Sequence, residues 1–149
     1  ELWVIGEGPL ASLIKEARLP GVAYQGKVEV DELRQAYRRA TVLVAPSLTL
    51  RRLGVRMWEE QFGFVTVEAM ASGLPVIASD CGAIPEVLGG CGLTVRQGDV
   101  VELVKNLEYL LGDEDMRRDL AERARRRVET FFNQDRQSTL FEETVLKWL

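Results

Sequence analysis

The stretch EQFGFVTVEAMASGLPVIASD, residues 60–80, decides the expected fold class. Its first half, from about Gly63 to Ser72, has the composition of a helix, and Gly73 is a suitable residue to end that helix. The second half contains Pro75 to Ala78, a short apolar run that is typical of a strand buried on both faces. A helix followed closely by a buried strand indicates an α/β domain with parallel strands.

The rest of the chain continues this alternation. Strands are expected at residues 2–5, 22–24, 42–45 and 92–95, and helices at 10–17, 31–40, 100–111, 114–132 and 134–149, with a short turn or helix at 84–88. Asp31 is expected to be the N-cap of its helix, and a polar loop is expected over 48–61. Short connections between strands and helices require right-handed crossovers. We therefore expect one domain over residues 1–149, an α/β fold with a doubly wound, mostly parallel, Rossmann-like sheet flanked by helices and with a helical C-terminal end.

The composition excludes several classes of function. The net charge of −4 disfavours non-specific nucleic-acid binding, so no nucleic-acid partner is expected. The chain has no histidine and only two cysteines, which excludes the usual zinc sites and Ser-His or Cys-His nucleophile pairs. No apolar run reaches the length of about eighteen residues that a membrane span needs, and no signal peptide opens the chain. We expect a cytoplasmic protein with reduced thiols.

Two carboxylates bracket the start of the expected helix at Gly63. Helical spacing from Phe64 places Val67, Glu68 and Ala71 on one stripe, which we expect to be buried. A buried carboxylate needs donors from the protein or from a ligand. Glu60 precedes the helix, whose first amides are unpaired and form an anion site. The pair is therefore a ligand site, with amides for a phosphate and acceptors for sugar hydroxyls, or it is structural. In the structural interpretation Glu60 is solvated, and Glu68 either extends to solvent or pairs with an arginine such as Arg52 or Arg56.

Glycine-containing loops follow several of the expected strands. In such folds ligands lie beyond the carboxyl ends of the strands, where these loops gather. Gly6 and Gly8 follow the first expected strand, and Gly26 and Lys27 follow the second. The glycine pair lacks the third glycine of the dinucleotide fingerprint, so a tight strand-to-helix turn is the alternative interpretation.

These motifs together resemble the C-terminal, donor-binding domain of retaining glycosyltransferases of family 4, which have the GT-B fold. The resemblance covers nearly the whole chain and thins out over the last expected helices. The segments that carry it are, in order, GEGP (6–9), GKV (26–28), PS (46–47), EQFGFVTVEAMASGLPVIASDCGAIPEV (60–87) and GLTVRQGD (92–99).

The resemblance implies a role for each matching residue. Glu60 matches the first acid of the family's E-x(7)-E motif, the catalytic position near the donor sugar, where hydrogen bonding to sugar hydroxyls is the expected role. Glu68 matches the acid that holds the ribose hydroxyls. Phe62, Gly63 and Phe64 match the segment whose amides approach the sugar and the diphosphate. Gly6, Gly8, Lys27 and Val28 match positions that line the nucleotide.

The resemblance also implies the activity and its partners. The donor would be a UDP- or GDP-sugar, and the hexosyl group would be transferred with retention, without a cofactor or a metal ion, to an acceptor held by a separate N-terminal domain. That domain, the first strand of this domain and the family's phosphate-binding Arg and Lys are all expected upstream of Glu1. We therefore expect no transfer by this chain alone and peripheral membrane association only through the missing half. The alternative is a non-catalytic α/β nucleotide-binding or interaction module.

Several further residues have both a ligand-binding and a structural interpretation. The loop over 48–61 is long for the family, and its arginines Arg51, Arg52 and Arg56 reach an anionic ligand or are solvated. The string Asp113-Glu-Asp115 is expected to cap a helix rather than to bind metal. Cys81 is expected to pack in the core, and Asp80 to cap the turn after it. The basic run at residues 123–127 is interleaved with acids and predicts a solvated helix face.

Overall fold

The computed structural model describes residues 1–133, and its contacts divide the chain into two compact units. The first unit is Glu1–Ala36 and the second begins at Tyr37, so the boundary falls inside a helix. The expectation of a single domain over residues 1–149 stays a prediction, and the helix expected at 134–149 lies outside the described residues.

The first unit is a βαβ arrangement that leads into a second helix. It contains β1 (Leu2–Ile5), α1 (Ala11–Ala17), β2 (Val22–Gly26) and the start of α2 (Val30–Arg39), and β1 pairs with β2 in parallel. The predicted N-cap at Asp31 is wrong, because α2 begins one residue earlier. Glu29 precedes the helix, and its N–H donates to Glu32 Oε2 at 3.1 Å. Asp31 pairs instead with Arg34 on the helix surface.

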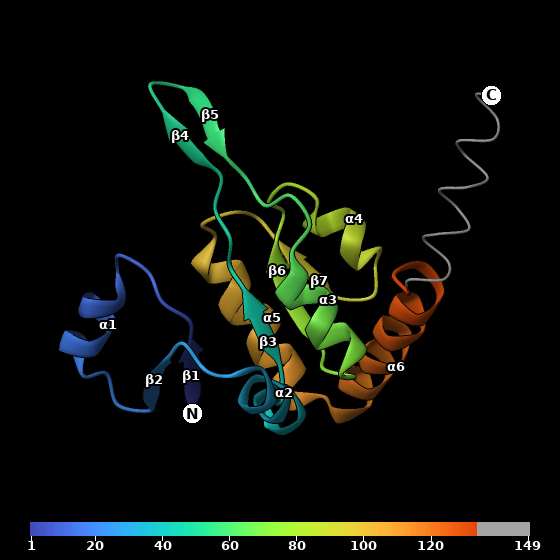
Figure 1. Ribbon diagram of the computed structural model, residues 1–149. Coiled ribbons are helices and arrows are strands. Elements are labelled where there is room, and N and C mark those ends of the chain that lie inside the picture. Colours follow the sequence, from blue (N-terminus) through green and yellow to red (C-terminus); the bar gives the residue numbers. More distant parts are fainter. Residues whose placement is uncertain (134–149) are drawn as a thin grey trace. The chain divides into compact units, whose positions relative to one another are not determined.

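The second unit contains a parallel sheet with helices packed against it (Figure 1). The strand order is β3-β6-β7, with every neighbouring pair parallel. Figure 1 shows α3 in front of this sheet and α5 behind it. The predicted fold class, a mostly parallel α/β arrangement flanked by helices with a helical C-terminal end, is confirmed. The elements of this unit are β3 (Leu43–Ala45), β4 (Leu50–Arg52), β5 (Val55–Trp58), α3 (Phe64–Ala71), β6 (Val76–Ser79), α4 (Ile84–Leu88), β7 (Leu93–Val95), α5 (Val100–Gly112) and α6 (Glu114–Phe131).

The core of the second unit forms around β6, the central strand. All four residues of β6 are buried, as its apolar sequence predicted. Ile77 from β6 packs with Val95, Leu110 and Leu120, so that β7, α5 and α6 close over the strand. A central parallel strand excludes water from both faces, which is why an uninterrupted apolar run forms it.

The expected polar loop over 48–61 is wrong in part, because it contains an antiparallel hairpin. Strand β4 pairs with β5 through Arg51 opposite Arg56 and Arg52 opposite Val55. Leu53 and Gly54 form the turn, with φ of 50° and 80°. Two consecutive residues with positive φ match the right-handed twist of a two-residue hairpin, and Gly54 adopts this conformation without steric cost.

The basic run on α6 is only partly solvated. Arg123, Arg125 and Arg126 each pair with an acid one helical turn away, as predicted. Arg127 does not, because it donates to the backbone carbonyls of Glu86 and Val87 in α4. The last carbonyls of a helix have no partner within it, so a donor from another element stabilises them.

Candidate functional site

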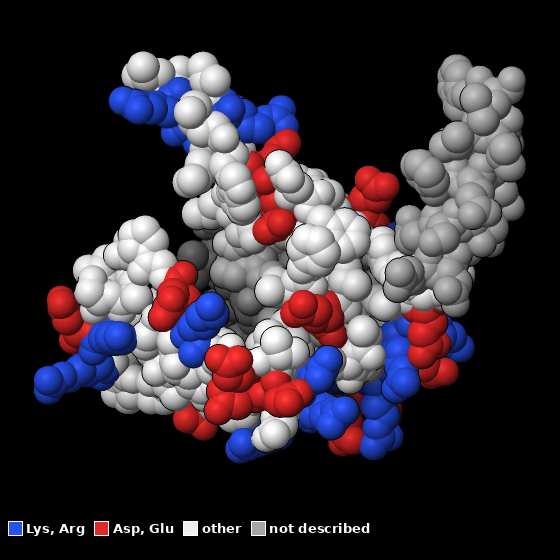
Figure 2. Space-filling model, viewed as in Figure 1, with Lys and Arg blue, Asp and Glu red and all other residues white. Residues whose placement is uncertain are grey.

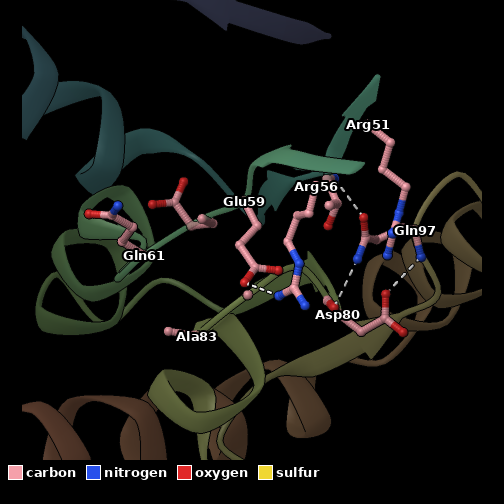
Figure 3. Close-up of a pocket in the computed structure, with 10 residues that line it drawn as sticks. Arg51, Arg56, Glu59, Gln61, Asp80, Ala83 and Gln97 are labelled. Carbon is pink, nitrogen blue, oxygen red and sulfur yellow. Dashed lines mark hydrogen bonds and ion pairs between the residues drawn. The ribbon is translucent and has the colours of Figure 1, made fainter. Parts of the chain in front are cut away.

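Polar residues gather in the second unit where β3, β6 and β7 end and α3 begins. They surround a cavity of about 550 Å³ (Figure 3). The hairpin and its flanks supply one part of the wall, and the segment between β6 and α4 supplies another. The lining residues are Thr49, Arg51, Arg56, Glu59, Glu60, Gln61, Asp80, Gly82, Ala83 and Gln97.

Glu60 is held at the edge of this cavity by two of its own acceptors. Its carboxylate Oε1 accepts a hydrogen bond of 3.0 Å from the N–H of Gly63, and its carbonyl accepts one of 3.0 Å from Ala83. Gly82 makes the second contact possible, because a Cβ there would lie 1.8 Å from the Glu60 carbonyl oxygen. The position of Glu60 therefore depends on the absence of a side chain at residue 82.

The N-terminus of α3 begins directly beyond Glu60. The carbonyl of Gly63 accepts from Thr66 at 2.9 Å and from Val67 at 3.3 Å, so hydrogen bonding within the helix begins there. The amides of Phe64 and Val65 come before that point and carry the positive end of the helix dipole. The ring of Phe62 lies 4.9 Å from that of Phe64, which is 71 % exposed. The sequence-predicted residues Glu60, Phe62, Gly63 and Phe64 are thus brought together.

The predicted burial of Glu68 is wrong. The buried face of α3 is formed by Thr66, Ala69 and Met70, whereas Phe64 and Glu68 are exposed. Of the expected stripe, Phe64, Glu68 and Ala71 are exposed and Val67 is half-buried. Glu68 does not line the cavity with Glu60.

Glu68 has a hydrogen-bond partner that was not predicted. Tyr37 Oη donates to Glu68 Oε2 at 2.9 Å. The structural alternative for Glu68 is therefore right in its exposure to solvent and wrong in the arginine partner. Tyr37 is only 8 % exposed. Burial, the hydrogen bond to Glu68 and the negative charge of Glu68 together raise the pKa of Tyr37 above its ordinary range. A signal was available, since a tyrosine on an otherwise apolar helix stripe needs a partner for its hydroxyl.

A hydrogen-bonded network ties the strand ends together below the cavity (Figure 3). Asp80 does not cap the following turn as predicted. Its Oδ1 accepts from the N–H of Gln97 at 2.8 Å, and Gln97 Nε2 donates to the Asp80 carbonyl at 3.1 Å. Gln97 Oε1 in turn accepts from the N–H of Thr49 at 2.7 Å. Gln97 is an unspecified position of the segment 92–99 and Thr49 lies in no motif, so only the pairing of the strands reveals them.

Arg51 and Arg56 bring positive charge to the same cavity. They stand directly opposite one another on the hairpin, and Arg56 pairs with Glu59 (Figure 3). Arg52 does not line the cavity. The ligand-contact hypothesis therefore concerns Arg51 and Arg56, and it stays a prediction.

The remaining predicted site residues belong to the first unit. The N–H of Gly6 donates to the carbonyl of Gly26 at 2.7 Å, and Tyr24 Oη donates to the carbonyl of Gly6 at 2.9 Å. The loops after β1 and β2 are therefore adjacent, as expected for the ends of paired parallel strands. Gly8 and Lys27 are exposed and Val28 is half-buried.

Two structural interpretations of polar residues are confirmed. Asp113 is the N-cap of α6, and its Oδ1 accepts from the N–H of Met116 at 2.9 Å. Cys81 is fully buried in the core. Over residues 1–133 no group of three or more Cys, Asp or Glu side chains is arranged to hold a metal ion. None of the helices in that range is both long and apolar enough to cross a membrane.

Comparisons with known proteins identify a family. The family model described as "Glycosyl transferases group 1" matches residues 1–113. The sulfoquinovosyl transferase SQD2 of Arabidopsis thaliana is 34% identical over 134 residues, which are 85% of this chain and 24% of that protein. The chain spans about a fifth to a third of the length of the curated relatives that it matches.

Solved structures agree with this assignment. The sucrose-phosphate synthase of Thermosynechococcus elongatus matches with a TM-score of 0.75 and 27% identity, over 98% of this chain and 39% of that one. The Anabaena protein HepE, solved in complex with UDP and glucose, has the same fold, with a TM-score of 0.70 and 21% identity over 94% of this chain and 40% of that one. The chain belongs to the glycosyl transferases group 1 family.

Proposed function

We propose that this chain is the donor-binding, C-terminal part of a retaining glycosyltransferase of family 4 type. It binds a UDP- or GDP-sugar, and the whole protein transfers the hexosyl group to an acceptor held by an N-terminal domain. The observation that carries the proposal is the placement of Glu60. Its carboxylate lies at the edge of a cavity and at the start of α3, beside the two amides that precede helical hydrogen bonding.

The chemistry of sugar transfer suits this arrangement. Departure of a nucleoside diphosphate leaves negative charge on the phosphate oxygens, and fixed N–H dipoles at a helix N-terminus stabilise such charge. In the proposal the amides of Phe64 and Val65 stabilise this charge without a metal ion or a cofactor. Glu60 accepts hydrogen bonds from hydroxyls of the donor sugar, and its bond to the N–H of Gly63 keeps the carboxylate oriented.

The nucleoside would be recognised by the other proposed residues. Glu68 is exposed, so its carboxylate is accessible to the two hydroxyls of a ribose. The hydrogen bond from Tyr37 occupies one carboxylate oxygen and fixes the rotamer. Gly6, Gly8, Lys27 and Val28 are proposed to line the nucleotide, by their match to the family pattern. HepE, solved with UDP and glucose, supports a nucleotide-sugar donor in this fold.

Calorimetric titration of the chain with UDP, GDP and their glucose and mannose conjugates tests the proposal. We expect heat with one nucleotide series, and weaker binding of that series by the Glu68→Gln variant. The Glu60→Gln variant should weaken the sugar conjugate more than the bare nucleotide, because Glu60 is assigned to the sugar. Glu108→Gln, an exposed acid on α5, is the matched control. No heat with any compound would overturn donor binding and favour the non-catalytic interaction module.

A further inference from the structure

The β4–β5 hairpin exposes apolar side chains that no other residue of the unit up to residue 133 covers. Every residue of both strands is exposed, and Leu53 in the turn is 97 % exposed. The large apolar side chains that it presents to solvent are Leu50, Leu53, Val55, Met57 and Trp58. A two-stranded hairpin with both faces in water is marginally stable, so these side chains contribute little to folding. Burial of these side chains therefore requires a partner outside the hairpin.

The turn residue strengthens this argument. Leu53 has a φ of 50°, a left-handed conformation that is unfavourable for a residue with a Cβ. It is also the most exposed residue of the hairpin, and it is apolar. Asparagine or glycine would suit both the turn and the solvent better. A leucine here costs stability in water, and it gains free energy only when the tip enters an apolar phase.

The charges on the hairpin identify the kind of partner. Arg51, Arg52 and Arg56 lie within a span from residue 48 to residue 58 that contains no acid. Figure 2 shows basic side chains gathered over the hairpin. Arg56 pairs with Glu59 at the base, whereas Arg51 and Arg52 form no ion pair with any of residues 1–133. The tip therefore carries uncompensated positive charge on a chain whose net charge is −4.

Leucine, methionine and tryptophan interspersed with arginines are the composition of segments that lie at a bilayer surface. Apolar side chains enter the acyl boundary, arginines extend toward anionic headgroups, and tryptophan settles at the interface. We propose that the β4–β5 hairpin binds the surface of anionic lipid bilayers, with the side chain of Leu53 inserted and the arginines at the headgroups. This contact goes beyond the proposed donor site and needs no nucleotide sugar.

The hairpin is also joined to the candidate donor site. Arg51 and Arg56 stand opposite one another on the hairpin and line the cavity beside Glu60. A bilayer contact at the tip would therefore place the cavity next to the lipid surface. This arrangement differs from the sequence-based expectation that membrane association arises only outside this chain.

Co-sedimentation of the 149-residue chain with lipid vesicles tests the proposal without any donor. We expect binding to vesicles of phosphatidylglycerol mixed equally with phosphatidylcholine, and little binding to phosphatidylcholine alone. Binding should fall as salt shortens the screening length from about 10 Å at 0.1 M to about 3 Å at 1 M. Equal binding to both kinds of vesicle, or none to either, would overturn the proposal.

Two sets of variants separate the parts of the hairpin. The triple variant Arg51→Gln, Arg52→Gln, Arg56→Gln should lower the partition coefficient at least about tenfold, since each basic residue near an anionic surface contributes several-fold. The control Arg118→Gln, Arg125→Gln, Arg126→Gln changes the net charge equally on exposed, acid-paired positions of α6. A similar loss in both variants would overturn the role of the hairpin.

Leu53→Asn tests insertion without harming the hairpin. The substitution produces the Asn-Gly pair that this turn type prefers, so the hairpin should form at least as well. Loss of the apolar tip should still lower vesicle binding by about tenfold. Val101→Ser is the control, because Val101 is an exposed apolar residue on α5, away from the hairpin. Undiminished binding by Leu53→Asn would overturn insertion of the tip.

Discussion

Tyr37 Oη donates a hydrogen bond of 2.9 Å to Glu68 Oε2, which joins the end of α2 to the surface of α3. The donor is buried and the acceptor is exposed, so the tyrosine holds in place a carboxylate that would otherwise sample several rotamers. Because this hydrogen bond fixes the Glu68 side chain, its carboxylate is oriented toward a ligand that binds at the exposed surface of α3. Tyr37 is therefore a positioning residue for Glu68 under the proposed function.

Replacing Tyr37 by phenylalanine should weaken nucleotide binding more than it weakens the fold. Loss of one hydrogen bond to an accessible carboxylate should lower the free energy of unfolding by about 1 kcal/mol, because water can take the vacant place at Glu68. Nucleotide affinity should fall several-fold. Urea denaturation and calorimetry measure the two effects, and Tyr109→Phe, an exposed tyrosine on α5, is the control. An unchanged affinity would remove Tyr37 from the site.

The raised pKa of Tyr37 predicts a loss of stability at high pH. The folded state keeps the phenolic proton at a pH where the unfolded chain, with a tyrosine pKa of about 10, has released it. Above pH 10 the unfolded state therefore binds fewer protons, and the free energy of unfolding should fall as the pH rises. Below about pH 10 Tyr37 is protonated in both states, so its contribution to the free energy of unfolding is fully present. Denaturation curves of the Tyr37→Phe variant should show a shallower decline, and an identical decline would contradict the assignment.

Gly82→Ala should destabilise the protein and displace Glu60. A Cβ at residue 82 would lie 1.8 Å from the Glu60 carbonyl oxygen, and its φ of +57° adds backbone strain. We expect a loss of roughly 2–4 kcal/mol in the free energy of unfolding, together with weaker binding of the sugar donor. Gly90→Ala is the matched control, because its φ is +76° but a Cβ there meets nothing within 4 Å. Equal losses in both variants would show that only backbone strain matters.

Arg127→Met should destabilise the packing of α6 on α4. The guanidinium donates to the carbonyls of Glu86 and Val87 and stands over the rings of Phe131 and Phe132. Methionine keeps much of the apolar stem but leaves the carbonyls without these donors, so we expect a loss of about 1–3 kcal/mol. Arg126→Met, on an exposed ion pair of the same helix, should cost less than about 1 kcal/mol. Thermal denaturation of the two variants compares them directly.

Much of the fold could be predicted from the sequence because its signals are local. The apolar run around Val76 and Ile77 predicts a buried strand, and Asp113 predicts the start of α6, since each depends on a few neighbouring residues. The acid Glu60 and the helix start beside it were predicted from the same stretch. The hairpin was missed because Arg51 and Arg52 suggest solvent, and only the turn at Leu53-Gly54 distinguishes two short strands from a loop.

The sequence by itself determined the order of the helices and of the parallel strands, the position of Glu60 before α3 and the family to which the chain belongs. Tertiary structure alone decided which face of α3 is buried. Two sets of residues on α3 have helical spacing: the expected set is Phe64, Val67, Glu68 and Ala71, and the buried set is Thr66, Ala69 and Met70. Packing against the neighbouring strands and helices selects the second set. Partners such as Tyr37 for Glu68 and Gln97 for Asp80 are distant in the chain, so only the folded arrangement brings their hydrogen-bonding groups within reach.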